Sequence, residues 1–227
     1  MEPTTFLCVK HGNKYTSTDV NNLYRMVKRN TSLPFIFICL TDSSHGLHRD
    51  IQVYNLPDLP LEKWWWKIFL FKEQWPGIKF YLDLDVAIQN NIDWLLTNTD
   101  TIQITDYSHL PIFGDYYHND QLYNSSMMIW SKDFSSIYDK FMKDYSLYTT
   151  VYRGLDGYLT SEVDCNLFSP LPPKALYSRN RGDAYQLIKP YDRVDGIATF
   201  YEKDYSVCMF NQCFEHKYLK HHRIYFL

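Results

Sequence analysis

The sequence lacks the features that mark membrane, secreted and nucleic-acid-binding proteins. No apolar run approaches the roughly 18 residues of a transmembrane helix, and the stretch MEPTTFLCVKHG lacks the basic and apolar regions of a signal peptide. The net charge is only −3 and no long basic run occurs, so a nucleic-acid partner is not expected. We therefore expect a soluble, cytoplasmic protein without an integral membrane segment.

Cysteines with metal-binding or redox spacing are also missing. None of the five cysteines forms a CxxC motif. Cys8, Cys39 and Cys208 lie in apolar runs, where a cysteine behaves as a small hydrophobic residue. We expect these three to be buried, reduced thiols, as is usual in a cytoplasmic protein.

Aromatic residues, in contrast, are abundant. They make up 18% of the 227 residues and include 20 Tyr and 6 Trp, within a hydrophobic share of 45%. This composition favours a sizeable core and a ligand-binding surface over disorder. No repeat, low-complexity tract or clear linker divides the chain, so one domain is predicted over residues 1–227. Its first half, about 1–135, has a nucleotide-fold-like pattern, and its second half, about 136–227, is loopier.

Short apolar runs alternate with helical patterns in the first half. Three runs predict buried strands: Thr5–Lys10, Pro34–Asp42 and Ile51–Leu56. A helix is predicted between the first two, with Ser17 or Thr18 as its N-cap. Its apolar face carries four residues at helical spacing: Val20, Leu23, Tyr24 and Val27. A second helix is predicted over Lys63–Phe71, so the pattern indicates an α/β fold with a largely parallel sheet.

The pattern continues after Asn90 and loosens from about Val151. The predicted elements there are a short helix in NIDWLLTN, strands in TIQITD and SSMMIW, an amphipathic helix in KDFSSIYDKFMKDYSLY, and short strands in QLIKP and SVCMF. The stretch SPLPPKALYSRNRG is irregular. The second half therefore carries fewer signals of regular structure than the first.

The segment IKFYLDLDVAIQN places two carboxylates inside an apolar run. Asp83 and Asp85 are expected at the end of a buried strand, and ligands bind beyond such ends in open parallel sheets. The two-residue period of a strand points both side chains to the same side. Neighbouring bare carboxylates repel each other, and a divalent cation that prefers oxygen ligands removes the conflict. The pair predicts a Mn²⁺ or Mg²⁺ site, with solvated acids at an exposed strand end as the alternative.

The segment YLDLDV after the tryptophan-bearing helix resembles the metal-binding DXD segment of GT-A nucleotide-sugar glycosyltransferases. The likeness is greatest to small bacterial and phage-borne enzymes related to the glycogenin and lipooligosaccharide galactosyltransferase group. Five segments occur in that family's order: VKHGNKYTSTDVNNLYRMVKRN, PFIFICLTD, WWWKIFLF, YLDLDV and YNSSMMIW. The resemblance implies a GT-A fold, in which helices flank a Rossmann-like, mostly parallel sheet and the loopier C-terminal half forms the acceptor side.

The resemblance gives the loop VKHGNKY, after the first strand, a nucleotide-binding role. Gly12 permits a tight turn there. Tyr15 offers a ring to stack on uracil. Lys10 or Lys14 is expected to meet phosphate, with a plain surface lysine as the alternative for Lys14.

The resemblance also assigns roles around the DXD segment. Asp83 and Asp85 would hold the metal, and Asp83 and Leu84 would contact the nucleotide. Lys67 matches a basic residue that reaches toward the DXD segment, where it would act as a catalytic residue by stabilising charge on the leaving diphosphate. Of the three tryptophans before Lys67, at least one is expected in the core and one along the acceptor site.

Two further segments are implied to contact the donor sugar. Asn124 and Ser125 match an Asn-Ser turn before a strand, although this pair is also ordinary turn chemistry. The family often has Gly-Asp-Gln before a helix, and this chain has RGLDGYL. Gly154 matches, Leu155 replaces the acid, and Asp156 stands where Gln is usual, so Asp156 is the candidate catalytic acid after a small shift.

The metal shell departs from the family as well. Relatives complete it with a His-Gly segment after a strand near the C-terminus, and SVCMFNQCFEH puts Asn211 at that place. An amide oxygen is an uncharged ligand, so weaker metal binding is expected. Three histidines further along are alternatives: His216, His221 and His222.

These residues together predict a metal-dependent hexosyltransferase that moves a sugar from a UDP-sugar, of the UDP-glucose or UDP-galactose type, to a glycan, lipid-linked or protein acceptor. Retention of the anomeric configuration is expected from the relatives, whereas a carboxylate that deprotonates the acceptor would give inversion. The alternatives are a metal-dependent phosphohydrolase or nucleotidyltransferase, and a non-catalytic nucleotide-sugar-binding module. A nucleotidyltransferase would carry a Gly-rich phosphate loop, and KHGNKY has one glycine. If a phage encodes the enzyme, its compartment is the host cytoplasm.

Overall fold

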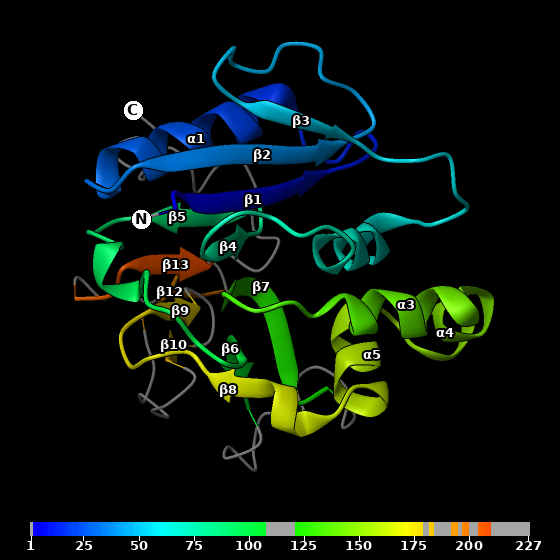
Figure 1. Ribbon diagram of the computed structural model, residues 1–227. Helices are drawn as coiled ribbons and strands as arrows, with labels where there is room; N and C mark the ends of the chain where they lie inside the picture. Colours follow the sequence, from blue (N-terminus) through cyan, green and yellow to red (C-terminus); the bar gives the residue numbers. More distant parts are fainter. Residues whose placement is uncertain are drawn as a thin grey trace.

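A mostly parallel sheet forms the centre of the fold (Figure 1). The computed structural model describes residues 2–107, 121–178, 182–183, 192–194, 197–199 and 204–209. The seven-stranded sheet has the order β3-β2-β1-β4-β7-β6-β8. Its strands are β1 Thr4–Lys10, β2 Phe35–Thr41, β3 Gln52–Asn55, β4 Lys79–Leu82, β6 Ile102–Asp106, β7 Tyr123–Trp130 and β8 Phe168–Pro170. Within it only β7 runs antiparallel to its neighbours, which confirms the predicted fold class.

A second, four-stranded sheet has the order β10-β9-β13-β5. Its strands are β5 Val86–Ile88, β9 Leu176–Ser178, β10 Gly182–Asp183 and β13 Val207–Met209. Strands β11 Asp192–Val194 and β12 Ile197–Thr199 form an antiparallel pair. Because β5 follows the DLD segment directly and Met209 pairs with Val86, β13 ends beside the two aspartates.

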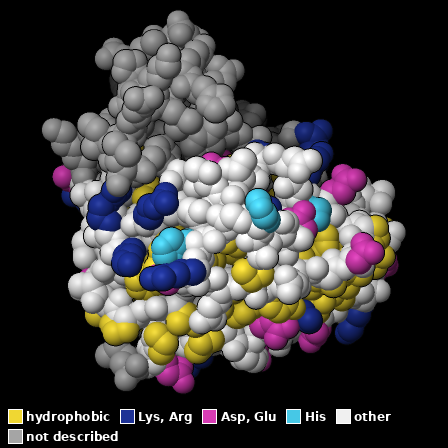
Figure 2. Space-filling view, turned by 90° about the horizontal axis from the view of Figure 1, so that it is seen from above, with side chains coloured by type: hydrophobic (Ala, Val, Ile, Leu, Met, Phe, Trp, Pro, Cys, Tyr) yellow, Lys and Arg dark blue, Asp and Glu magenta, His cyan; other side chains and the backbone are white. Residues whose placement is uncertain are grey.

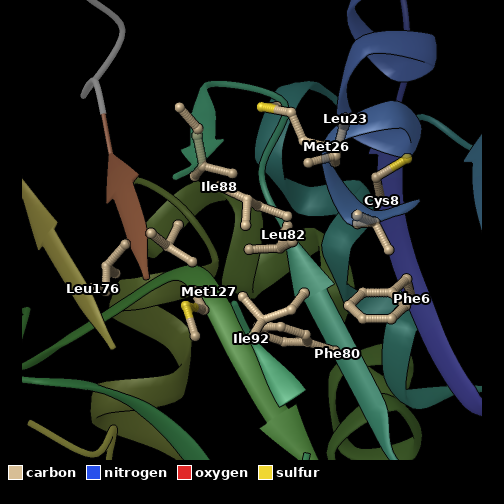
Figure 3. Packing of buried hydrophobic residues seen from close by; sticks show 14 of the residues in the cluster. Phe6, Cys8, Leu23, Met26, Phe80, Leu82, Ile88, Ile92, Met127 and Leu176 are labelled. Carbon is tan, nitrogen blue, oxygen red and sulfur yellow. The ribbon is translucent and has the colours of Figure 1, made fainter. Parts of the chain in front are cut away.

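The helices lie on both faces of the large sheet (Figure 1). They are α1 Ser17–Asn30, α3 Ser135–Lys143, α4 Tyr145–Val151, α5 Leu155–Glu162 and the 3₁₀ helices η1 Lys63–Phe71, η2 Asp93–Leu95 and η3 Cys165–Leu167. Side chains of β1 alternate between the faces, as a two-residue period requires. Phe6 and Cys8 pack with the α1 face (Figure 3), whereas Leu7 packs with η1, α3 and α5.

The predicted apolar face of α1 is confirmed, but its predicted N-cap is wrong. The four predicted residues are buried, and Met26 joins them. The N-cap is Thr16, whose backbone N–H donates to the Asp19 carboxylate over 2.7 Å, while the Thr16 side chain faces the Asp19 backbone N–H. Only Thr16 has an acid three residues later, so it forms a reciprocal capping box that Ser17 and Thr18 cannot form.

Three of the cysteines behave as predicted. Cys8, Cys39 and Cys208 are buried, Cys165 is exposed, and none of these four forms a disulfide within the described part of the chain. Cys213 and the strand predicted in QLIKP lie outside the described residues. The face seen from above carries Lys, Arg, Asp and Glu side chains with hydrophobic ones between them, so neither sign of charge dominates it (Figure 2).

Candidate active site

A cavity of about 1060 Å³ opens beyond the carboxyl ends of β1 and β4. Its walls come from the loop after β1, the start of η1, the DLD segment after β4, the first half of β7 and the start of α5. Strand β1 lies between β2 and β4, so the order of the strands reverses its direction at β1. Open α/β sheets bind ligands at such a switch point. Small-molecule sites usually occupy about 300–1000 Å³, so this cavity has room for a large ligand.

Lys67 lies at the centre of the polar wall. Its Nζ is 2.7 Å from Oδ1 of Asp83 and 3.3 Å from Oγ of Ser125, and the Tyr81 hydroxyl also donates to the Asp83 carboxylate. Only 13% of the Lys67 side chain and 19% of the Asp83 side chain are exposed. Burial alone would lower the pKa of Lys67, but the carboxylates of Asp83 and Asp156 raise it above its ordinary value. Lys67 is therefore a fixed positive charge in the cavity.

Asp156 joins this group from the first turn of α5. Its carboxylate accepts the Ser125 N–H over 3.1 Å and also the Ser125 hydroxyl. Burial raises the pKa of Asp156 above its ordinary value, against the opposing effects of Lys67 and of the Ser125 hydrogen bonds. The structure thus brings together Lys67, Asp83, Ser125 and Asp156, which are far apart in the sequence.

Asp85 lies on the other side of Asp83, facing the loop after β1. It is 6% exposed, and its charge acts on the Tyr15 hydroxyl. Burial and then the charges of Asp85 and Asp83 raise the pKa of that hydroxyl well above its ordinary value. Leu84, between the two aspartates, is buried and lines the cavity. Both aspartates line the same cavity, but not for the predicted reason: residues 83–85 lie between β4 and β5 rather than in a strand, and Leu84 lines the cavity with them.

The loop after β1 is held by Asp42, at the end of β2. The Gly12 N–H donates to Oδ2 of Asp42 over 2.9 Å, and Gly12 has a φ of +66°, the left-handed conformation that glycine adopts at little cost. Lys10 is 8% exposed and pairs with Asp42 over 3.4 Å. Lys14 is exposed and lines the cavity, whereas Lys10 is not among the lining residues. Lys14 is therefore the better-placed of the two lysines for a ligand's phosphate.

Asn124 and Ser125 were predicted to form a turn before a strand, but they lie inside β7. The register of β6 against β7 shifts between Ile104 and Thr105, so that Thr105 pairs with Asn124 and Ile104 with Met128. Such a bulge re-aims side chains next to functional sites. The polar residues next to this shift, Asn124, Ser125 and Ser126, line the cavity.

Several lining residues were not singled out from the sequence. His11 stacks on Trp66 with ring centroids 4.7 Å apart, and Gln121 and Arg153 also line the cavity. For His11, the one signal in the sequence for a place in the cavity wall is its position next to Gly12 in the loop. Asn211 and the three C-terminal histidines lie outside the described residues.

The fold is that of the GT-A glycosyltransferases, and the cavity occupies the position where such α/β folds bind ligands. The galactosyltransferase LgtC, in complex with donor and acceptor sugar analogues, superposes with a TM-score of 0.63 at 11% identity, covering 92% of this chain and 87% of LgtC. A glycosyltransferase involved in glycosylation of the PBCV-1 major capsid gives 0.56 at 9% identity, covering 98% and 99%.

GlyE of Streptococcus pneumoniae TIGR4 gives a TM-score of 0.57 at 11% identity, covering 76% of this chain and 46% of GlyE. No family model matches the sequence. No curated protein gives a significant match. Among the described residues, no helix is both long and apolar enough to cross a membrane. The similarity to solved glycosyltransferases is therefore one of fold.

Proposed function

We propose that the protein is a hexosyltransferase that moves a sugar from a UDP-sugar to an acceptor with retention of the anomeric configuration. The observation that carries the proposal is the position of Lys67 between Asp83 and Asp156 at the switch point of a GT-A fold. A fixed cation there stabilises the negative charge that develops on a departing diphosphate. The similarity of the fold to solved glycosyltransferases supports the same activity.

The other lining residues have roles that follow from their places in the cavity. Tyr15 and the turn at Gly12 form the nucleotide side, with Lys14 toward the phosphates. Ser125 and Asp156 form the sugar side, where hydroxyl and carboxylate oxygens can accept hydrogen bonds from donor-sugar hydroxyls. Asn124 completes this side, although its Oδ1 already accepts the Ser126 N–H over 3.1 Å.

The donor set near Asp85 fits a divalent cation. Asp83 and Asp85 offer hard carboxylate oxygens, and each carboxylate has about four lone-pair positions, so its present partners leave capacity. The described residues contain no cluster of three or more ligating His, Cys, Asp or Glu side chains, so the proposed third ligand is Asn211. When bound, Mn²⁺ or Mg²⁺ would neutralise the diphosphate. We further propose a cytoplasmic location, which the buried, reduced cysteines favour.

Titration calorimetry with UDP, with and without Mn²⁺, tests the proposal. We expect Mn²⁺-dependent binding that is lost in Asp85→Asn and kept in Asp100→Asn, because Asp100 is an exposed residue paired with Lys132 on the surface. Turnover of UDP-glucose and UDP-galactose, with NMR of the anomeric proton of the product, then tests transfer and retention. Failure of the wild-type protein to bind UDP in the presence of Mn²⁺ would overturn the UDP-sugar assignment.

A further inference from the structure

Trp64 is the one tryptophan of the WWW segment that is not in the core. It is 40% exposed and lines the cavity, while Trp65 and Trp66 are 6% and 1% exposed. A 3₁₀ helix has three residues per turn, so residues three apart lie on the same face. Trp64 therefore shares its face of η1 with Lys67, which also lines the cavity.

The indole of Trp64 rests on the backbone of Gly154, at the N-cap of α5. A Cβ atom at Gly154 would lie 2.2 Å from Nε1 and 2.4 Å from Cδ1 of Trp64. The backbone of Gly154 is extended, with a φ of 169°, so any residue could adopt its conformation. Glycine is needed at this position for the space that the indole occupies. The contact places the ring two residues before Asp156.

Trp64 lies on the sugar side of the cavity. Tyr15, from the nucleotide loop, contacts Asp85, whereas Trp64 contacts the residue that begins the Asp156 turn. The backbone before Trp64 is strained, because Lys63 has a φ of +52°, which non-glycine residues rarely adopt. Such strain persists where surrounding contacts hold it, often at ligand-binding segments.

Polar groups accompany Trp64 in the cavity wall. The Lys63 ammonium lies 5.5 Å from the centroid of the indole. Glu62, Gln121 and Arg153 line the same cavity. A flat aromatic ring among charged and amide groups suits a ligand with an apolar face and hydroxyl edges. A pyranose ring has both, whereas an acyl chain would need a continuous apolar groove. The side of the cavity away from the nucleotide loop is also where an acceptor must meet the donor sugar.

We propose that Trp64 is a platform for the acceptor and that the acceptor is a carbohydrate, whose pyranose ring stacks on the indole while Gly154 holds the indole in place. The inference rests on the proposed function, because it takes the Asp156 side as the donor-sugar side. Trp64 is a binding residue for the acceptor, and Gly154 is a positioning residue that acts through Trp64.

Saturation-transfer difference NMR with UDP and Mn²⁺ present tests the platform, with lactose, maltose and methyl β-D-galactopyranoside as probes. At least one probe should receive saturation at its ring C–H protons in the wild type. Trp64→Ala should weaken its binding about tenfold, which corresponds to the loss of one aromatic contact. Gly154→Ala should weaken it as well, because the new methyl group displaces the indole. Trp94→Ala is the control: Trp94 is 46% exposed, and its Nε1 bonds Ser206 outside the cavity.

UDP calorimetry on the same variants separates the two proposals. Retained UDP binding with weakened saccharide binding in Trp64→Ala and Gly154→Ala supports the platform. Retained UDP binding with unchanged saccharide binding, or with no saccharide bound by the wild type, overturns the platform alone. Loss of UDP binding in Trp64→Ala would place the indole under the nucleotide and overturns the acceptor assignment. Absence of UDP binding in the wild type overturns the proposed function, and the platform with it.

Discussion

The ammonium of Lys67 lies 2.7 Å from Oδ1 of Asp83, although one residue is on η1 and the other follows β4. The same ammonium also reaches the Ser125 hydroxyl, which in turn donates to Asp156. Lys67 therefore connects the proposed metal side of the cavity to the proposed sugar side. A change at Lys67 should affect both the stability of the fold and the chemistry.

Replacing Lys67 by Met should lower the free energy of unfolding by about 3 kcal/mol, because it leaves two partly buried carboxylates without their cation. It should also lower turnover at saturating donor by at least about a hundredfold, since the cation near the leaving group is lost. Urea denaturation and steady-state kinetics measure the two effects. Lys67→Met combined with Asp83→Asn should regain much of the stability but none of the activity. Full activity in Lys67→Met would contradict the assigned role.

Acid should weaken a clamp formed by Asp93 between η2 and the chain after α1. The carboxylate accepts hydrogen bonds from the Thr31 hydroxyl and from the Ser32 N–H and hydroxyl, the last over 2.6 Å. Burial works to raise the pKa of Asp93, but these hydrogen bonds and that of Asn91 outweigh it and lower the pKa to about 2. The folded pKa is thus below the unfolded one, so the clamp is at full strength above about pH 4 and weakens as pH falls toward 2.

Asp93→Ala should therefore cost about 1–2 kcal/mol of unfolding free energy at pH 7, the value of a few charged hydrogen bonds. The difference from the wild type should shrink steadily between pH 4 and the lowest pH at which the protein stays folded. Urea titrations at a series of pH values measure it. Asp100→Ala, on the exposed surface, serves as the control and should show a difference near zero throughout. A pH-independent loss in Asp93→Ala would count against the clamp.

Asp42 should control the affinity for the nucleotide without touching it. Burial opposes ionisation of Asp42, but the hydrogen bond from Gly12 and the charge of Lys10 outweigh it and lower its pKa, so the group is a carboxylate at neutral pH. Asp42→Ala frees the Gly12 turn, and the Kd for UDP should rise about tenfold, corresponding to roughly 1.4 kcal/mol. Asp42→Asn keeps an acceptor for Gly12 and should show a smaller rise. Equal UDP affinity in all three proteins, measured by calorimetry, would disprove the coupling.

Asn211→His should tighten Mn²⁺ binding about tenfold, because the imidazole nitrogen is a more basic electron-pair donor than an amide oxygen. The described part of β13 ends with Met209 opposite Val86, the residue after Asp85, and Asn211 follows two positions later. Electron paramagnetic resonance of free Mn²⁺ gives the affinity directly. Gln212→His is the matched control. An equal gain of Mn²⁺ affinity in both variants would contradict the proposal that residue 211 is a metal ligand.

The sequence predicted the parts of the fold that depend on local pattern. The apolar spacing in α1 and the apolar run before Asp83 were sufficient to place a helix face and a buried strand end. The N-cap at Thr16 was missed because Ser17 and Thr18 are equally good cap residues, and only the reciprocal bond with Asp19 distinguishes them.

The sequence predicted which residues belong to the site, but not how they are arranged. Lys67, Ser125 and Asp156 were singled out, but their meeting depends on the packing of η1 and α5 against the sheet and on the bulge at Thr105, none of which has a local signal. Which of the three tryptophans is exposed depends on the three-residue period of η1, and a run of identical residues does not reveal that period. His11 was missed because its partner, Trp66, comes from a distant element.

Strand β1 is shared by both hydrophobic clusters, through Phe6 on one face and Leu7 on the other, and it pairs with β2 and β4 along its two edges. Opening it locally would break both clusters and both ladders together, so its amides should exchange with solvent only when the whole fold opens. The turn at Gly12 leaves directly from this strand. The proposed nucleotide side of the cavity is thus attached to the strand that we expect to open most slowly, whereas α4, which has no buried residue, can fray without disturbing it.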